Sequence, residues 1–352
     1  DVYKRQLIDP TAGPVICRFG KRNLDGMSFL APLVNNRVGD LLNLELRHQQ
    51  LFFIQGDRVI YDIGYDEKGR RFSEADFGKP IRTLEDLNKN GYWFVGRNYD
   101  PDIMLEALEH QGEQIAFERL EGAAPTFVWL GGFKSDMAGT KAQTLAEWAS
   151  ERSQAFVRFD YSGHGVSGGK FEDGTISRWL SDTLAVLDQL TDGPLVLVGS
   201  SMGGWLALLA ARARPERVKG LLLIAPAADF TERLMWAGFT PKERRQILAY
   251  GRLEQPSEYS TEPNIITRDL IEDGRKHLIM GAPIPFDGPC YILQGQADPD
   301  VPPSHVLELH DLIRTDNKMI DLIKDGDHRL SRPEDLDRLI QRASMIAKQL
   351  AC

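Results

Sequence analysis

The chain has 352 residues and a formal net charge of -9 at pH 7, and its three cysteines are scattered at Cys17, Cys290 and Cys352. The length exceeds that of one typical domain and predicts about two domains. The negative charge argues against nucleic acids and anionic membranes as partners. No apolar run approaches the ~20 residues that a membrane-spanning helix needs.

The N-terminal part, residues 1–101, carries no motif that points to a function. Its residue pattern predicts a helix over 37–49 and strands over 50–54 and 59–63. We expect a region of α+β structure and unassigned role, which is a separate module, a cover for a sheet edge, or sequence foreign to the natural protein. Residues 102–352 then form the second domain.

In this second domain, apolar strands alternate with helices. Strands are expected at 125–130, 155–161, 194–198, 218–224, 291–296 and 318–323, and helices at 176–190, 204–211, 304–314 and 334–350. Nearly continuous apolar strands separated by helices predict a mostly parallel sheet with helices on both faces. In such sheets, functional groups gather beyond the carboxyl ends of the strands.

The most informative motif is Gly199-Ser200-Ser201-Met202-Gly203, which follows an apolar strand and precedes a buried helix. Strand, Gly-x-Ser-x-Gly and helix together are typical of a nucleophile elbow. The turn lifts the serine hydroxyl to the N-terminus of the helix, where free amides and the helix dipole favour negative charge. Ser201 is therefore the candidate nucleophile.

A serine nucleophile needs a histidine base and a carboxylate, which follow the serine in chain order in this kind of sheet. His328 follows a predicted strand and its turn, whereas His277, His305 and His310 are expected on solvated helix surfaces. For the acid, Asp298 follows the strand at 291–296, and the nearby Asp300 stays open as an alternative. Asp327 is disfavoured because side chains adjacent in sequence rarely face one another.

An oxyanion hole needs two backbone amides directed at the carbonyl oxygen as it gains charge. The amide of Met202, directly after the nucleophile, is one candidate. The loop after the strand at 125–130 supplies the other, and Phe133 is preferred there over Gly132 and Lys134. These segments together predict an α/β-hydrolase core.

The regular alternation breaks at about residues 228–288, where a small helical cap is expected over the site. Its apolar residues are Phe230, Leu234, Met235, Trp236 and Phe239. Part of this group is expected to form the cap's own core, and the remainder to line an acyl pocket. The candidate substrate-binding residues are Trp205, Met235 and Trp236.

Two further patterns bear on whether the chain binds a cofactor or a metal. Residues 163–168 match the Gly-x-Gly-x-x-Gly dinucleotide fingerprint, but a polar loop follows where the fingerprint requires a helix. We expect a loop near the catalytic face instead. The cysteines are too scattered for a zinc site, and no cofactor and no metal are expected.

The stretches 132–141, 158–165, 199–205 and 326–329 together resemble one branch of the α/β-hydrolases. This branch contains a mitochondrial acyl-protein thioesterase, which also cleaves acyl glucuronides, and its bacterial relatives. The resemblance covers the chain from about residue 113 to the C-terminus. Its triad has a serine, the aspartate of a Gly-x-x-Asp-x-x-Val-Pro turn and the histidine of an Asp-His-Arg sequence. The resemblance implies Ser201, Asp298 and His328 and favours Asp298 over Asp300. One departure is Gly131-Gly132, where many relatives carry Pro-Gly or His-Gly, and its effect is expected to be mild because the donors are amides.

The resemblance implies hydrolysis of carboxylic esters or thioesters through an acyl-enzyme. The expected substrate is a small acyl ester or thioester, or an S-acylated protein, and the oligomeric state stays open. An acyltransferase, a peptidase or a haloperoxidase with the same triad is an alternative, as is a non-catalytic binding protein. Few cysteines favour a cytoplasmic location, or a mitochondrial one if a transit peptide has been lost, since the sequence does not begin with Met.

Overall fold

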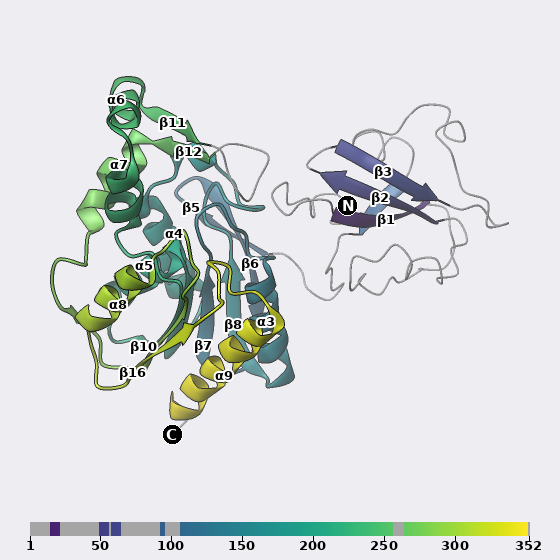
Figure 1. Ribbon diagram of the computed structural model, residues 1–352. Helices are drawn as coiled ribbons and strands as arrows, with labels where there is room; N and C mark the ends of the chain where they lie inside the picture. Colours follow the sequence, from purple (N-terminus) through teal and green to yellow (C-terminus); the bar gives the residue numbers. More distant parts are fainter. Residues whose placement is uncertain are drawn as a thin grey trace. The chain divides into compact units, whose positions relative to one another are not determined.

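The computed structural model describes residues 106–255 and 264–350, together with the backbone of four strands between residues 15 and 95. The chain divides into two compact units, Asp1–Met104 with Ser257–Thr261 and Leu105–Pro256 with Glu262–Cys352. The two units are drawn in Figure 1, where the colours follow the sequence.

The first unit contains an antiparallel sheet in the strand order β3-β2-β1-β4. Its strands are β1 (Val15–Lys21), β2 (Gln49–Gln55), β3 (Arg58–Gly64) and β4 (Tyr92–Val95). The two strands expected at 50–54 and 59–63 are thus confirmed. The helix expected over 37–49 lies outside the described residues apart from Gln49, where β2 begins.

The second unit is built on an eight-stranded sheet in the order β16-β14-β10-β9-β7-β8-β6-β5. Its strands are β5 (Glu106–His110), β6 (Glu113–Leu120), β7 (Ala123–Leu130), β8 (Gln154–Phe159), β9 (Leu195–Ser200), β10 (Val218–Ile224), β14 (Cys290–Gly295) and β16 (Lys318–Ile323). The pairs from β16 to β8 are parallel, and β6 and β5 add an antiparallel edge. The predicted mostly parallel sheet is confirmed.

Helices cover both faces of this sheet, as Figure 1 shows. The main helices are α3 (Thr140–Glu151), α4 (Ile176–Leu190), α5 (Met202–Ala213), α8 (Pro303–Leu312) and α9 (Pro333–Leu350). Side chains alternate along the strands: Leu197 of β9 joins the cluster under α4, α5 and α8, whereas Val196 and Val198 join the cluster under α3 and α9. The central strands β9, β10 and β14 are therefore buried on both faces, which explains why they are almost entirely apolar.

The segment between β10 and β14, residues 225–289, is called the insert here. Its elements are η4 (Thr231–Trp236, π-helical), α6 (Pro241–Tyr250), β11 (Arg252–Gln255), β12 (Asn264–Thr267), α7 (Arg268–Gly274), η5 (Arg275–His277) and β13 (Ile284–Pro285), and a further short helix, η3 (Phe171–Asp173), precedes α4. β11 and β12 form an antiparallel pair, and β13 pairs with β15 (Ile313–Arg314). The sequence pattern predicted the helices of the insert but not these strands.

The helix expected at 304–314 ends at Leu312, and β15 takes up its last two expected residues. The prediction that His305 lies on a solvated surface is wrong, because the residue is only 7% exposed. His305 precedes Val306, and both lie on the face of α8 that is buried with Leu309. Its charged neighbours in sequence belong to the outer face of the same helix.

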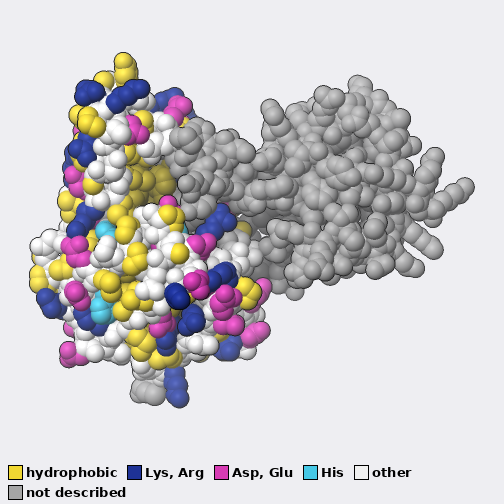
Figure 2. Space-filling view, in the orientation of Figure 1, with side chains coloured by type: hydrophobic (Ala, Val, Ile, Leu, Met, Phe, Trp, Pro, Cys, Tyr) yellow, Lys and Arg dark blue, Asp and Glu magenta, His cyan; other side chains and the backbone are white. Residues whose placement is uncertain are grey.

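On the face drawn in Figure 2, positive and negative side chains are interspersed, and hydrophobic side chains gather in a recess below the insert. Within the described residues, no helix combines the length and the apolar character that crossing a membrane would require.

Candidate active site

Ser201 occupies the turn between β9 and α5, with a backbone φ of 53° and ψ of -117°. This left-handed conformation is strained for a residue with a side chain and is typical of functional sites. The turn is held by hydrogen bonds from Ser201 N to Ile224 O at 2.8 Å and from Ala227 N to Ser201 O at 3.0 Å. A side chain at Gly203 would overlap with the carbonyl oxygen of Leu130, so glycine there lets α5 approach β7 closely.

His328 and Asp298 meet Ser201 at the carboxyl end of the sheet. His328 Nε2 lies 3.1 Å from Ser201 Oγ, and His328 Nδ1 lies 2.9 Å from Asp298 Oδ2. An ionised carboxylate only accepts hydrogen bonds, so Nδ1 carries the proton and Nε2 is free to accept the one on Ser201. The three residues expected to form the catalytic triad are thus linked by two consecutive hydrogen bonds, from serine to histidine and from histidine to aspartate.

Several groups hold the Asp298 side chain, which is itself buried. Its Oδ1 accepts hydrogen bonds from the amides of Asp300 at 2.9 Å and Val301 at 2.8 Å, and its Oδ2 accepts one from Gln294 Nε2 at 3.3 Å. Burial is the largest single influence on the pKa of Asp298 and raises it by favouring the neutral acid. The hydrogen bond from His328, the charge of His328 and the hydrogen bonds from the two amides together outweigh burial. The pKa of Asp298 is therefore lowered, and the group is a carboxylate at neutral pH.

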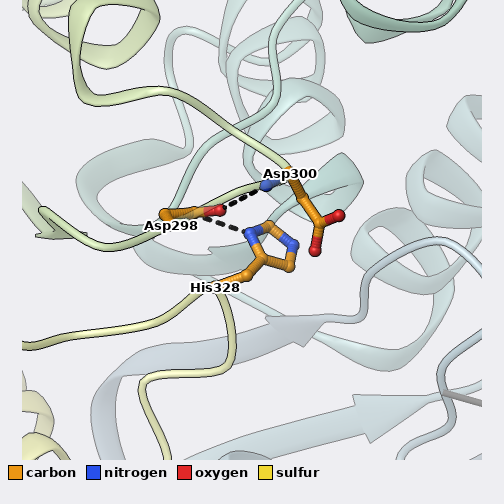
Figure 3. A group of neighbouring side chains, drawn as sticks. All are labelled: Asp298, Asp300 and His328. Atoms are coloured by element: carbon orange, nitrogen blue, oxygen red, sulfur yellow. Dashed lines mark hydrogen bonds and ion pairs between the residues drawn. The ribbon is translucent and has the colours of Figure 1, made fainter. Parts of the chain in front are cut away.

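Asp300, the alternative acid, contributes its amide to this arrangement. Figure 3 shows its carboxyl group pointing away from Asp298, whereas Asp298 is hydrogen-bonded to the imidazole of His328. The ligand atoms of Asp298, Asp300 and His328 all lie within 4.8 Å of one another, so these groups could hold a metal ion. A metal ion there would be bound by Asp298 and His328, whose side chains are hydrogen-bonded to each other. Metal binding would therefore compete with this hydrogen bond.

The loop after β7 lies beside the nucleophile. A side chain on Gly132 would come within 3.4 Å of Ser201 Cβ. The amide of Lys134 donates a hydrogen bond to His164 Nε2 at 3.3 Å, so this amide is already engaged. Of the three candidate amides of this loop, those of Phe133 and Gly132 remain. Met202 N belongs to the first turn of α5, where amides have no partner within the helix.

The three candidate substrate-binding residues lie in different surroundings. Trp205 is fully buried on α5, and its Nε1 donates to His277 O at 3.3 Å. Met235 is partly buried and packs against both the main core and the cluster inside the insert. Trp236 packs on the insert's own cluster, and the guanidinium groups of Arg244 and Arg275 lie 5.4 and 5.0 Å from its ring centroid.

Two buried aspartates hold the insert together and join it to helix α4. Asp229 accepts hydrogen bonds from the amides of Ile279 and Met280, both at 2.9 Å, which joins the beginning of the insert to its later part. Asp273 accepts one from Ser177 N at 2.7 Å, which joins α7 to the first turn of α4. The half-buried His277 also contacts Ser177, 2.7 Å from its Oγ, so this histidine belongs to a joint and not to the solvated surface predicted for it.

Sequence reasoning missed three residues that support the site. Gln294 is fully buried on β14 and bonds both Asp298 and the carbonyl of Val301 at 3.1 Å. Lys141 of α3 donates to the carbonyl of Arg329, next to His328, and burial lowers the pKa of this lysine to about 8. His164 bonds the loop after β7. A glutamine at the end of an apolar strand was a readable signal, but the other two depend on contacts distant in sequence.

Comparison with known proteins identifies relatives of the second unit. Residues 128–269 match a family model described as "Serine aminopeptidase, S33". Over 227 residues, which are 64% of this chain, the sequence is 37% identical to the "Palmitoyl-protein thioesterase ABHD10, mitochondrial" of Mus musculus and covers 76% of that protein. The protein of the same name from Homo sapiens is 35% identical over 227 residues and is covered to 74%.

Solved structures agree with these relatives. A putative hydrolase from Agrobacterium vitis S4 has 46% sequence identity and a TM-score of 0.66, covering 69% of this chain and 98% of its own. The structure of mouse alpha/beta hydrolase domain-containing protein 10 has 35% identity and a TM-score of 0.66, covering 70% of this chain and 99% of its own. The chain therefore belongs to the α/β-hydrolase family, in the branch of these thioesterases, and is an ester or thioester hydrolase.

Proposed function

We propose that this hydrolase cleaves acyl esters and thioesters with Ser201 as nucleophile, His328 as general base and Asp298 as the carboxylate that orients His328. The observation that carries the proposal is the continuous chain of hydrogen bonds from Ser201 Oγ through the imidazole to Asp298, at 3.1 and 2.9 Å. This geometry matches the arrangement in which a neutral imidazole takes the proton of an attacking serine.

In the first half of the reaction, Ser201 Oγ attacks the acyl carbonyl carbon while His328 Nε2 takes its proton. Negative charge develops on the carbonyl oxygen, and the amides of Met202 and Phe133 stabilise it. An oxyanion donor contributes roughly 3 kcal/mol to the transition state. The protonated His328 then gives its proton to the departing thiol or alcohol, which leaves the acyl group on Ser201. Asp298 stabilises the imidazolium that forms in between.

In the second half, His328 takes a proton from water, and the resulting hydroxide attacks the acyl-enzyme. The same two amides stabilise the second tetrahedral intermediate. Its collapse returns the proton to Ser201 and releases the carboxylic acid. An acyltransferase differs only in using another nucleophile in place of water, so product analysis separates the two activities.

The acyl group is expected to contact apolar residues around the oxyanion loop and the insert. Support comes from the ring of Phe230, which lies 5.8 Å from that of Phe133 and 5.7 Å from that of Trp205. Met235 also packs against this core and is flexible enough to accommodate chains of different length. Each buried methylene contributes roughly 0.8 kcal/mol, or about fourfold in affinity. Trp236 is supported less, because its described contacts lie within the insert.

The leaving group is the less constrained part of the substrate. The mouse and human relatives are named palmitoyl-protein thioesterases, which favours an S-acylated protein or a small acyl thioester as the substrate of this chain. Peptides are expected to be poor substrates because an amine leaves only when it is firmly protonated. The same relatives are named mitochondrial, and the cytoplasmic location expected from the sequence stays a prediction. The domain boundary between residues 101 and 102 and the cap at about 228–288 also stay predictions.

The test is a panel of acyl groups on one leaving group. Acetyl, butyryl, octanoyl and palmitoyl esters and thioesters are assayed with the wild-type chain and with Ser201→Ala, together with a peptide anilide. We expect kcat/KM to rise from acetyl to octanoyl, by at most about fourfold per methylene, with no turnover by the variant and little on the anilide. A steady fall in kcat/KM from acetyl onward would contradict the proposed acyl pocket but would not affect the proposed triad. Full turnover by Ser201→Ala would contradict the proposed triad.

A further inference from the structure

His164 lies in the turn at residues 163–168, the glycine-rich motif that matches the dinucleotide fingerprint. Its side chain is buried, with the residue 3% exposed. Aromatic rings enclose it: the ring centroids of Tyr161, Phe171 and Trp179 lie 5.4, 5.1 and 5.1 Å from that of the imidazole, all edge to face. An imidazole enclosed in this way is fixed in orientation and kept from water.

Both ring nitrogens of His164 face backbone groups. Nδ1 lies 3.3 Å from the carbonyl oxygen of Ser162, which can only accept a hydrogen bond. Nε2 lies 3.3 Å from the amide of Lys134, which can only donate one. These partners select the neutral tautomer with the proton on Nδ1 and a free lone pair on Nε2. Burial acts in the same direction, because it lowers the pKa of His164 to about 4 and so favours the uncharged ring.

The backbone that His164 contacts belongs to the loop beside Ser201. Lys134 has a φ of 58°, the left-handed conformation that a residue with a side chain adopts at some cost. Such a conformation persists only where surrounding contacts hold it. The hydrogen bond to His164 is one such contact, and a second anchor further along the loop is the bond from Met137 N to Asp160 Oδ1 at 2.7 Å.

Phe133, the residue before Lys134, carries the amide proposed as an oxyanion donor. Its ring packs against Phe171 at 4.9 Å, and Phe171 in turn packs against His164. The imidazole therefore contacts the loop directly through the Lys134 amide and indirectly through Phe171. Loss of the first contact would free the backbone at Lys134 while leaving the aromatic packing in place.

We propose that His164 is a positioning residue for the oxyanion hole: by accepting a hydrogen bond from the Lys134 amide, it holds the backbone of Phe133 so that the Phe133 amide is directed at the substrate's carbonyl oxygen. The proposal rests on the serine mechanism proposed above. His164 touches neither the substrate nor Ser201 in this account, and its effect passes through the loop.

Two substitutions separate the hydrogen bond from the packing. His164→Phe keeps an aromatic ring but has no acceptor, and His164→Gln restores an acceptor oxygen on a flexible chain. Val166→Ala, at an exposed position of the same turn, serves as the control. Each variant is assayed for kcat and KM on an octanoyl thioester and for inhibition by a trifluoromethyl ketone, whose tetrahedral adduct carries an oxyanion. Thermal unfolding checks that each variant is folded.

We expect His164→Phe to lower kcat by about 10- to 100-fold, less than the loss of a whole oxyanion donor. Its KM should stay within about threefold, and the ketone should bind more weakly by a factor similar to the loss in kcat, because both depend on the oxyanion. His164→Gln should recover most of both losses. A folded His164→Phe variant with wild-type kcat and ketone binding would overturn the proposal.

A measurement on the wild-type chain applies even if His164→Phe does not fold. Nitrogen-15 NMR of the labelled imidazole distinguishes the tautomers, and we expect a protonated Nδ1 and an unprotonated Nε2 at neutral pH. A proton on Nε2 would contradict the proposal, since that nitrogen could not then accept from Lys134. If instead the wild-type chain lacked esterase and thioesterase activity altogether, the proposed function would fail while this tautomer result still stood.

Discussion

Asp298 and His328 follow two neighbouring parallel strands, and the 2.9 Å hydrogen bond between them joins the loops beyond those strands. β14 and β16 end side by side, with Gly295 opposite Ile323. Because parallel strands end at one edge of the sheet, a carboxylate and an imidazole shortly after the two strand ends are brought within reach of each other. Ser201 follows β9, two strands further along the same edge.

The acid of the triad can be tested by comparing two neighbouring aspartates. Asp298→Asn removes the charge that orients His328 and stabilises its protonated form, so kcat should fall by about 10⁴-fold. Asp300→Asn is the matched control, because the Asp300 amide that bonds Asp298 is retained. Its kcat should stay within a few-fold of the wild-type value. Equal losses in the two variants, measured on one thioester, would contradict the assignment of Asp298.

Lys141 is predicted to hold the loop that carries His328. Its ammonium group donates to the carbonyl of Arg329 and lies 3.5 Å from Ser331 Oγ. Lys141→Met should lower kcat about tenfold, because misplacement of a catalytic group by a fraction of an ångström is costly. Lys141→Arg should retain more activity than Lys141→Met, since it can still donate to the carbonyl. Lys324→Met, at an exposed position, is the control, and a Met variant at position 141 as active as this control would contradict the prediction.

The pKa of His164 predicts a dependence of stability on pH. Burial lowers this pKa from 6.5 to about 4, so between these values the unfolded chain binds a proton that the folded chain does not. The free energy of unfolding should therefore fall as the pH falls from about 6.5 to 4, by up to about 3 kcal/mol from this group alone.

The measurement compares urea unfolding of the wild-type chain and of His164→Gln at several pH values. The variant cannot take up this proton, so the difference between the two curves isolates the contribution of His164. The wild-type chain should lose stability relative to the variant across this window. A constant difference from pH 7 to pH 4 would show that the imidazole is not held in its neutral form.

Gly203 predicts a steric effect at the nucleophile elbow. A methyl group there would overlap with the backbone oxygen of Leu130, and backbone cannot rotate away as a side chain can. Gly203→Ala should lower the free energy of unfolding by about 1–3 kcal/mol or displace α5 from β7, with loss of activity. Gly238→Ala is the control, because nothing lies within 4 Å of a methyl group at that position. Thermal unfolding of both variants checks the difference, and equal stability would contradict the close approach.

The sequence predicted what depends on local pattern and chain order. The turn at Ser201 was predictable because small residues, an apolar strand before it and an apolar helix after it specify one geometry. Lys141 and His164 could not be found in this way, because their partners lie 188 and 30 residues away in the chain. Each bonds these distant partners through backbone groups, which leave no trace in the sequence.

The insert was the hardest part to predict for a related reason. Its apolar residues serve two clusters, one inside the insert and one shared with the main core, and a helical pattern does not say which cluster a given face joins. Met235 contacts both, whereas Trp236 packs on the insert's own cluster and lies near two arginines. His305 was expected on the solvated surface of a predicted helix, yet it lies on the buried face of that helix.

The most direct test of the central claim is the site of a covalent label. A fluorophosphonate reacts readily with a serine where a base activates the serine and backbone amides donate hydrogen bonds to the oxygen that gains charge. The full chain is labelled, digested and analysed by peptide mass spectrometry, with His328→Ala as the comparison. We predict one adduct on Ser201 in the wild-type chain and its near absence in the variant. No adduct, or an equal adduct in both proteins, would contradict the serine mechanism.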